Sequence, residues 1–111
     1  MKAHEFTKPK IGIIGLGIMG TALAKRLQEK GYQLFLYNRT SERAIQVARK
    51  HDNVCRSPAH LAKHADIIIS FVSDDMASEN VWFGTDGAAS SAKKSSICIE
   101  SSTLSPDYIE S

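Results

Sequence analysis

Hydrophobic residues recur with two different spacings along this chain of 111 residues. Short apolar runs rich in β-branched residues alternate with stretches in which apolar residues return every three or four positions, a pattern typical of strands and helices that alternate in a parallel sheet. The short runs predict strands over 10–14, 33–37, 54–55, 66–71 and 96–100. The other stretches predict helices over 18–30, 43–51, 58–64 and 76–83, a partly helical connection over 87–94 and a further helix that starts at 105–106.

Residues with strong terminal preferences mark several helix ends. Gly31 follows the first helix, where glycine commonly ends a helix. Ser41 is the expected N-cap of the second helix. Ser57 and Pro58 form a cap followed by proline in the first turn, which predicts the start of the third helix. The continuous apolar run 66–71 is typical of a strand that is buried on both faces.

The first predicted strand leads into a G-x-G-x-x-G motif, Gly15–Gly20, at the start of the first helix. Gly15 allows a sharp turn, Gly17 allows a pyrophosphate to approach the backbone, and Gly20 allows close packing of helix on sheet. The N–H groups of the first helical turn then face the phosphates. The motif therefore predicts a dinucleotide site that includes Leu16, Ile18 and Met19.

The fold class expected from these features is α/β. We predict a doubly wound parallel sheet of the Rossmann type in three layers, α/β/α, over residues 10–111, with residues 1–9 as an N-terminal tail.

Composition excludes several function classes. The formal net charge is +2 and basic residues are scattered, so neither nucleic acid nor a membrane surface is an expected partner. No apolar run approaches the roughly 20 residues of a membrane span, and residues 1–10 lack the apolar core of a signal peptide, so we expect a cytoplasmic protein. Cys55 and Cys98 are expected as buried free thiols. His60 and His64 have a metal-compatible spacing, but no third ligand completes a site, and no metal is expected.

The end of the second predicted strand carries Asn38, Arg39 and Thr40. An NAD site usually has an acidic residue here, which binds the ribose 2′-hydroxyl. Asn38 lacks the charge that would repel a 2′-phosphate, Arg39 can bind that phosphate through two hydrogen bonds, and Thr40 adds a hydroxyl donor. We therefore predict NADP as the cofactor in preference to NAD, the alternative being a plain polar loop before the next helix.

Hydroxyl groups follow the last predicted strand, at the edge where open α/β sheets bind ligands. Ser102 and Thr103 can hydrogen-bond a substrate carboxylate or the nicotinamide. They can equally cap the next helix, and spacing alone does not decide between these roles.

Together these motifs resemble the β-hydroxyacid dehydrogenase family, which includes 3-hydroxyisobutyrate dehydrogenase, glyoxylate/succinic semialdehyde reductase and 6-phosphogluconate dehydrogenase. The resemblance extends over about residues 10–111 and includes Met19 in the glycine motif and a Ser-Thr-x-Ser-Pro stretch at 102–106. Glu100 stands where the family has Asp. The resemblance implies that Val72 and Ser73 lie beside the cofactor, that Thr103 also contacts it, and that Ser102 and Thr103 bind substrate. Val72–Asp75 resembles the semialdehyde reductase branch.

In this family, hydride passes between the nicotinamide and a short hydroxy acid, oxo acid or semialdehyde. The resemblance implies that a separate helical domain supplies a lysine as proton-transfer residue and most contacts of a homo-oligomer. Its G-x-x-x-K-x-x-x-N motif is not present here, so we expect an N-terminal domain that has no catalytic residue and is inactive by itself.

Two alternatives share these motifs. An imine reductase has the same cofactor domain and a different catalytic residue in place of the lysine, namely Asp or Tyr. A non-catalytic dehydrogenase-like module has a small residue there.

Overall fold

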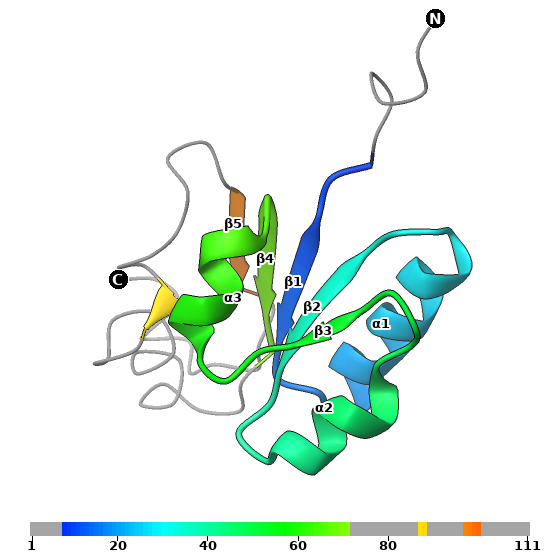
Figure 1. Ribbon diagram of the computed structural model, residues 1–111, viewed down its shortest axis with the longest axis horizontal. Coiled ribbons are helices and arrows are strands. Elements are labelled where there is room, and N and C mark those ends of the chain that lie inside the picture. Colours follow the sequence, from blue (N-terminus) through cyan, green and yellow to red (C-terminus); the bar gives the residue numbers. More distant parts are fainter. Residues whose placement is uncertain (1–7, 72–86, 89–96, 101–111) are drawn as a thin grey trace, which may run out of the picture.

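A computed structural model of the chain describes residues 8–71, 87–88 and 97–100. Their strands form one parallel sheet in the order β3-β2-β1-β4-β5 (Figure 1). The strands are β1 (Ile11–Ile14), β2 (Leu34–Tyr37), β3 (Asn53–Val54), β4 (Ile67–Ser70) and β5 (Ile97–Glu100). The helices are α1 (Ile18–Glu29), α2 (Ser41–Val47) and α3 (Pro58–His64).

Helices cover both faces of this sheet, as Figure 1 shows. Because side chains alternate along a strand, the central strands contribute to two cores. The core beneath α1 and α2 contains Ile11, Ile13, Leu16, Ala24, Leu34, Leu36, Ala44 and Val47. The core beneath α3 contains Ile14, Phe35, Cys55, Leu61, Ala62, Ala65, Ile68 and Ala88. The predicted α/β/α layering and doubly wound parallel sheet are confirmed.

The order of the strands determines where a ligand site can form. From β1 the chain crosses to β2 on one side, whereas from β4 it continues to β5 on the other side. The connections therefore diverge at the carboxyl ends of β1 and β4, which is the position where open α/β sheets bind ligands.

Two predicted helix boundaries are confirmed. The Ser57 hydroxyl accepts a hydrogen bond from the His60 N–H at 3.1 Å, and Pro58 lies in the first turn of α3. Gly31 has a φ of +86°, the left-handed conformation in which glycine is favoured after a helix.

The prediction for α2 is wrong at both ends. Thr40, rather than Ser41, is the N-cap residue, with extended backbone and no side-chain capping bond. The helix ends at Val47 instead of continuing to residue 51. Beyond it, the Arg49 N–H donates to the Asp52 carboxylate at 2.9 Å, so this side chain replaces a helical carbonyl as the acceptor.

Other predictions also need correction. The third strand starts one residue earlier than expected, at Asn53. In β4 one face is fully buried and the other only partly, because residues Ile67 and Ile69 remain half-buried. The predicted helix over 76–83, the connection over 87–94 except residues 87–88, and the helix from 105 lie outside the described residues.

Gly12 allows α3 to pack closely on β1. A Cβ at this position would overlap the Leu61 side chain and lie 3.0 Å from the Ala65 Cβ. We therefore expect Gly12→Ala to lower the free energy of unfolding by about 1–3 kcal/mol, measured by urea denaturation. Gly17→Ala is the matched control, because within residues 8–71, 87–88 and 97–100 no atom lies within 4 Å of a Cβ there. Equal stability of the two variants would refute this account of α3 packing.

The two thiols differ in exposure, contrary to the expectation that both are buried. Cys55 is buried and Cys98 is exposed. Burial raises the pKa of the Cys55 thiol to about 11, although a backbone hydrogen bond with Leu36 opposes the shift. Since the thiolate is the reactive form, we expect a thiol reagent at pH 8 to modify Cys98 quickly and Cys55 slowly, with the Cys55 rate still rising as the pH approaches 11. Cys98→Ser should abolish the fast phase, and its survival in that variant would contradict the prediction.

Candidate functional site

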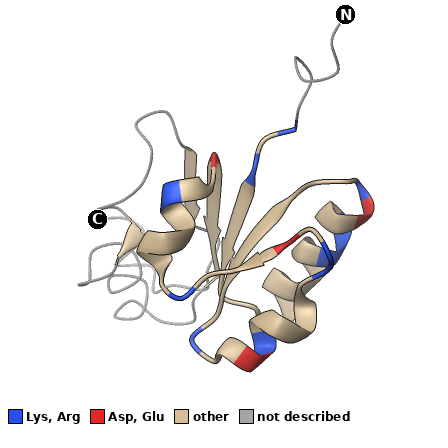
Figure 2. Cartoon of the chain, viewed as in Figure 1, with Lys and Arg blue, Asp and Glu red and all other residues tan. Residues whose placement is uncertain are grey.

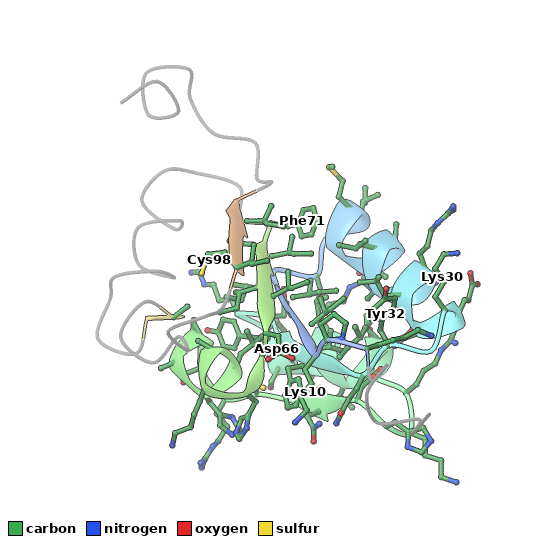
Figure 3. The ribbon with its side chains drawn as sticks, turned by 90° about the horizontal axis from the view of Figure 1, so that it is seen from above. Lys10, Lys30, Tyr32, Asp66, Phe71 and Cys98 are labelled. Carbon is green, nitrogen blue, oxygen red and sulfur yellow. The ribbon has the colours of Figure 1, made fainter. Side chains whose placement is uncertain are left out.

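The connection between β1 and α1 together with the first three residues of α1, residues 15–20, is called the glycine loop below. Gly15 has a φ of +92°, and a Cβ there would overlap the carbonyl oxygen of Phe71 at the end of β4. A Cβ on Gly20 would overlap the carbonyl oxygen of Gly15. Figure 3 shows Phe71 beside the start of α1, at the opposite end of the sheet from Lys10 and Asp66. Gly15 is thus required for the loop to approach the backbone of Phe71, and Gly20 for α1 to approach the backbone of Gly15.

Gly17 differs from the other two glycines of the loop. It is the N-cap residue of α1, its φ of −76° suits any residue, and no atom of the described residues lies within 4 Å of the place a Cβ would take. A side chain is therefore absent here although the protein itself leaves room for one. Open space beside the backbone at a helix N-terminus is what the approach of a phosphate requires.

The first turn of α1 offers hydrogen-bond donors to that space. Within the described residues, the N–H groups of Ile18, Met19 and Gly20 have no acceptor. The turn contains no acidic side chain and no side-chain cap, and the Ile18 and Met19 side chains are 89% and 61% exposed. These amides and the helix dipole favour an anion.

Leu16 is held by side chains from α1, from α2 and from the connection between β2 and α2. Its own side chain is buried, and its N–H donates to Asn38 Oδ1 at 2.8 Å. Its carbonyl oxygen accepts from Arg43 Nε at 2.9 Å and from Thr21 Oγ1 at 3.0 Å. Asn38 also donates through Nδ2 to the Thr40 carbonyl at 3.0 Å. Three side chains therefore fix the backbone of the glycine loop.

Of the predicted residues Asn38, Arg39 and Thr40, the structure brings Asn38 into contact with the glycine loop. Asn38 touches the loop directly, whereas Arg39 and Thr40 are exposed and their side chains have no hydrogen-bond partner among the described residues. Sequence reasoning missed Arg43, which contacts Leu16 across 27 positions of sequence. A second arginine in the first turn of α2, only four residues beyond Arg39, was the available signal.

Basic residues outnumber acidic ones beside the glycine loop. Arg39 and Arg43 lie at the start of α2, with Glu42 as the acidic residue of that first turn. No Lys, Arg, Asp or Glu lies in β1, β2, β3 or β4, and apart from Glu100 at the end of β5 the described charged residues lie on helices and connections (Figure 2).

Other predicted site residues are not placed by the structure. β4 and β5 end in register, with Ser70 opposite Glu100. Val72, Ser73, Ser102 and Thr103 lie outside the described residues.

A cavity of about 450 Å³ opens at the end of the sheet opposite to the glycine loop. None of the predicted site residues lines it. It is lined by Gln28, Gly31, Tyr32, Gln33, Arg49, His51 and Asp52. Among the described residues no group of three potential metal ligands occurs, and His64 instead stacks on Phe35 with ring centroids 5.5 Å apart. In the described part of the chain, no helix has the length and apolar character to cross a membrane.

Comparison with known families identifies one match, over residues 10–111, to the NAD binding domain of 6-phosphogluconate dehydrogenase. Among curated proteins, the chain is 36% identical over 101 residues to the uncharacterized oxidoreductase YfjR of Bacillus subtilis, covering 91% of this chain and 35% of that protein. It is 37% identical over 100 residues to the mitochondrial 3-hydroxyisobutyrate dehydrogenase of Mus musculus, covering 90% of this chain and 30% of that enzyme. The chain thus spans about a third of the length of these relatives.

Solved structures share the fold. An imine reductase from Myxococcus stipitatus in complex with NADP+ superposes with a TM-score of 0.80 at 24% identity, covering 92% of this chain and 35% of that one. Its V8 variant in complex with NAD+ gives a TM-score of 0.80 at 23% identity, over 91% and 34% of the two chains. At this identity the likeness establishes the fold alone.

Proposed function

The chain belongs to the family of the NAD binding domain of 6-phosphogluconate dehydrogenase, and we propose that its glycine loop binds NADP. The observation that carries the proposal is the open space at Gly17 beside the N–H groups of Ile18, Met19 and Gly20, which have no acceptor among the described residues. These amides would bind the pyrophosphate, with Gly15 and Leu16 holding the loop in shape. When bound, the nicotinamide of the cofactor accepts or donates a hydride.

The preference for NADP over NAD rests on the end of β2. Arg39 is exposed and its guanidinium has no partner among the described residues, so it is available to a 2′-phosphate. Asn38 is neutral, and both ends of its amide are used to hold Leu16 and Thr40. Thr40 would add a hydroxyl. One imine reductase structure with the same fold contains NADP+ and the other contains NAD+. The similarity of fold therefore does not distinguish between the two cofactors.

For the whole protein we propose an NADP-dependent oxidoreductase that acts on a short β-hydroxy acid, the corresponding oxo acid or a semialdehyde. The name of the mouse relative supports this class. In this proposal Val72 and Ser73 contact the cofactor, Ser102 and Thr103 contact substrate or nicotinamide, and the proton-transfer residue lies outside the 111 residues. The boundary at residue 10, the cytoplasmic location and the homo-oligomer remain predictions. An imine reductase would use the same cofactor residues.

Gly17→Ala tests the site itself. Its Cβ would extend into the open space without touching the protein, so we expect unchanged thermal stability and a loss of NADP+ affinity of about tenfold or more, measured by isothermal titration calorimetry. Gly12→Ala provides the opposite control, because it should reduce stability without touching the site. Wild-type affinity in the Gly17→Ala variant would rule out the glycine loop as the binding site.

Arg39→Ala tests the choice of cofactor. A hydrogen bond to a charged group contributes about 1.5–3 kcal/mol, so we expect NADP+ affinity to fall by about 10- to 100-fold while NAD+ affinity changes little. Arg49→Ala is the matched control, since it removes the same charge from an exposed residue at the opposite edge of the sheet. Equal binding of NAD+ and NADP+ by the wild-type chain would refute the preference.

A further inference from the structure

Arg43, Thr21 and the Leu16 carbonyl form a closed hydrogen-bonded triangle. Arg43 Nε and Thr21 Oγ1 both donate to the Leu16 oxygen, at 2.9 and 3.0 Å, and Arg43 Nη2 donates to Thr21 Oγ1 at 3.3 Å. The Thr21 hydroxyl therefore acts as donor and acceptor at once. Each corner of the triangle comes from a different element: the glycine loop, α1 and α2.

This triangle uses one edge of the Arg43 guanidinium. An arginine fork binds two acceptors through a pair of neighbouring N–H groups, and here the Nε and Nη2 pair is directed at Leu16 and Thr21. Arg39 differs, because no such bond ties its guanidinium to the described part of the protein. The Arg43 guanidinium is thus fixed by hydrogen bonds to the protein, whereas that of Arg39, four residues earlier, has no such bond to the described residues.

The triangle also fixes the direction of the next N–H group. The Leu16 carbonyl and the Gly17 N–H belong to one planar peptide unit and point in opposite directions across it. Holding the carbonyl on Arg43 therefore holds the Gly17 N–H facing away from Arg43, and that N–H has no acceptor among the described residues. Charge on the guanidinium further polarises this peptide and makes its N–H a stronger donor.

We propose that Arg43 and Thr21 are positioning residues for the pyrophosphate, which act through the Leu16 carbonyl, and that Arg43 is not the residue that selects for the 2′-phosphate. The proposal rests on nucleotide binding at the glycine loop. It predicts a specific pattern: loss of the triangle weakens NAD+ and NADP+ equally, because both carry the same pyrophosphate, whereas loss of Arg39 affects NADP+ alone.

The test uses Arg43→Lys, which keeps the charge but cannot reproduce the fork. We expect about tenfold weaker binding of both nucleotides with an unchanged NADP+/NAD+ affinity ratio. Thr21→Val should shift both affinities in the same direction, and Thr21→Ser, which retains the hydroxyl, should bind like the wild type. Two results for Arg43→Lys would overturn the proposal: weaker binding of NADP+ alone, or wild-type affinity for both nucleotides.

A ligand-free measurement separates this inference from the proposed function. In the amide NMR spectrum of the unliganded chain, Arg43→Lys should move the Gly17 resonance, while Arg39→Ala should leave it in place. An unmoved Gly17 resonance in Arg43→Lys would also overturn the proposal. If the wild-type chain bound neither nucleotide, the proposed function would fail, and the Gly17 resonance would still decide whether Arg43 positions the loop.

Discussion

Beyond the carboxyl end of β1, Gly15 and Gly20 leave no space for a side chain, and the site is built around that constraint. Gly15 packs against the backbone of Phe71, and Gly20 packs against Gly15 itself, so three backbone segments meet where any Cβ would overlap an oxygen atom. The close approach brings the start of α1 over the end of the sheet. As a result, the N–H groups of the first helical turn, which have no acceptor in the described part of the chain, lie at the position where the connections from β1 and β4 diverge.

Features encoded by neighbouring residues were predictable from the sequence. The apolar runs gave the strands, and Ser57 followed by Pro58 gave the start of α3, because a side-chain cap acts within three residues. The end of α2 was not predictable in this way. The Asp52 carboxylate accepts hydrogen bonds from the Arg49 N–H, the Leu34 N–H and Gln28 Nε2, and this arrangement exists only after α1 and β2 have packed together.

The candidate site likewise contains features that the sequence predicted and features that it did not. The glycine spacing and the end of β2 predicted Asn38 beside the glycine loop, since parallel strands end at a common edge. Asn38 was interpreted through the charge it lacks, yet the structure uses its amide to bind Leu16 across 22 positions of sequence. Arg43 reaches the same residue across 27 positions. No local pattern carries such information, because both contacts depend on how α2 docks beside the loop.

In a parallel sheet, the amino ends and the carboxyl ends of the strands also need different hydrogen-bonding partners. Strand amino ends present free N–H groups, and in the described residues the aspartates that accept them, Asp52 and Asp66, lie at that edge. At the carboxyl edge the Leu16 carbonyl needs donors, and Arg43 provides them. In the described residues, two backbone N–H groups at the amino end of the sheet therefore donate to carboxylates, and the Leu16 carbonyl at the other end accepts from a guanidinium. The positive charge of Arg43 beside the glycine loop thus satisfies the protein's own backbone.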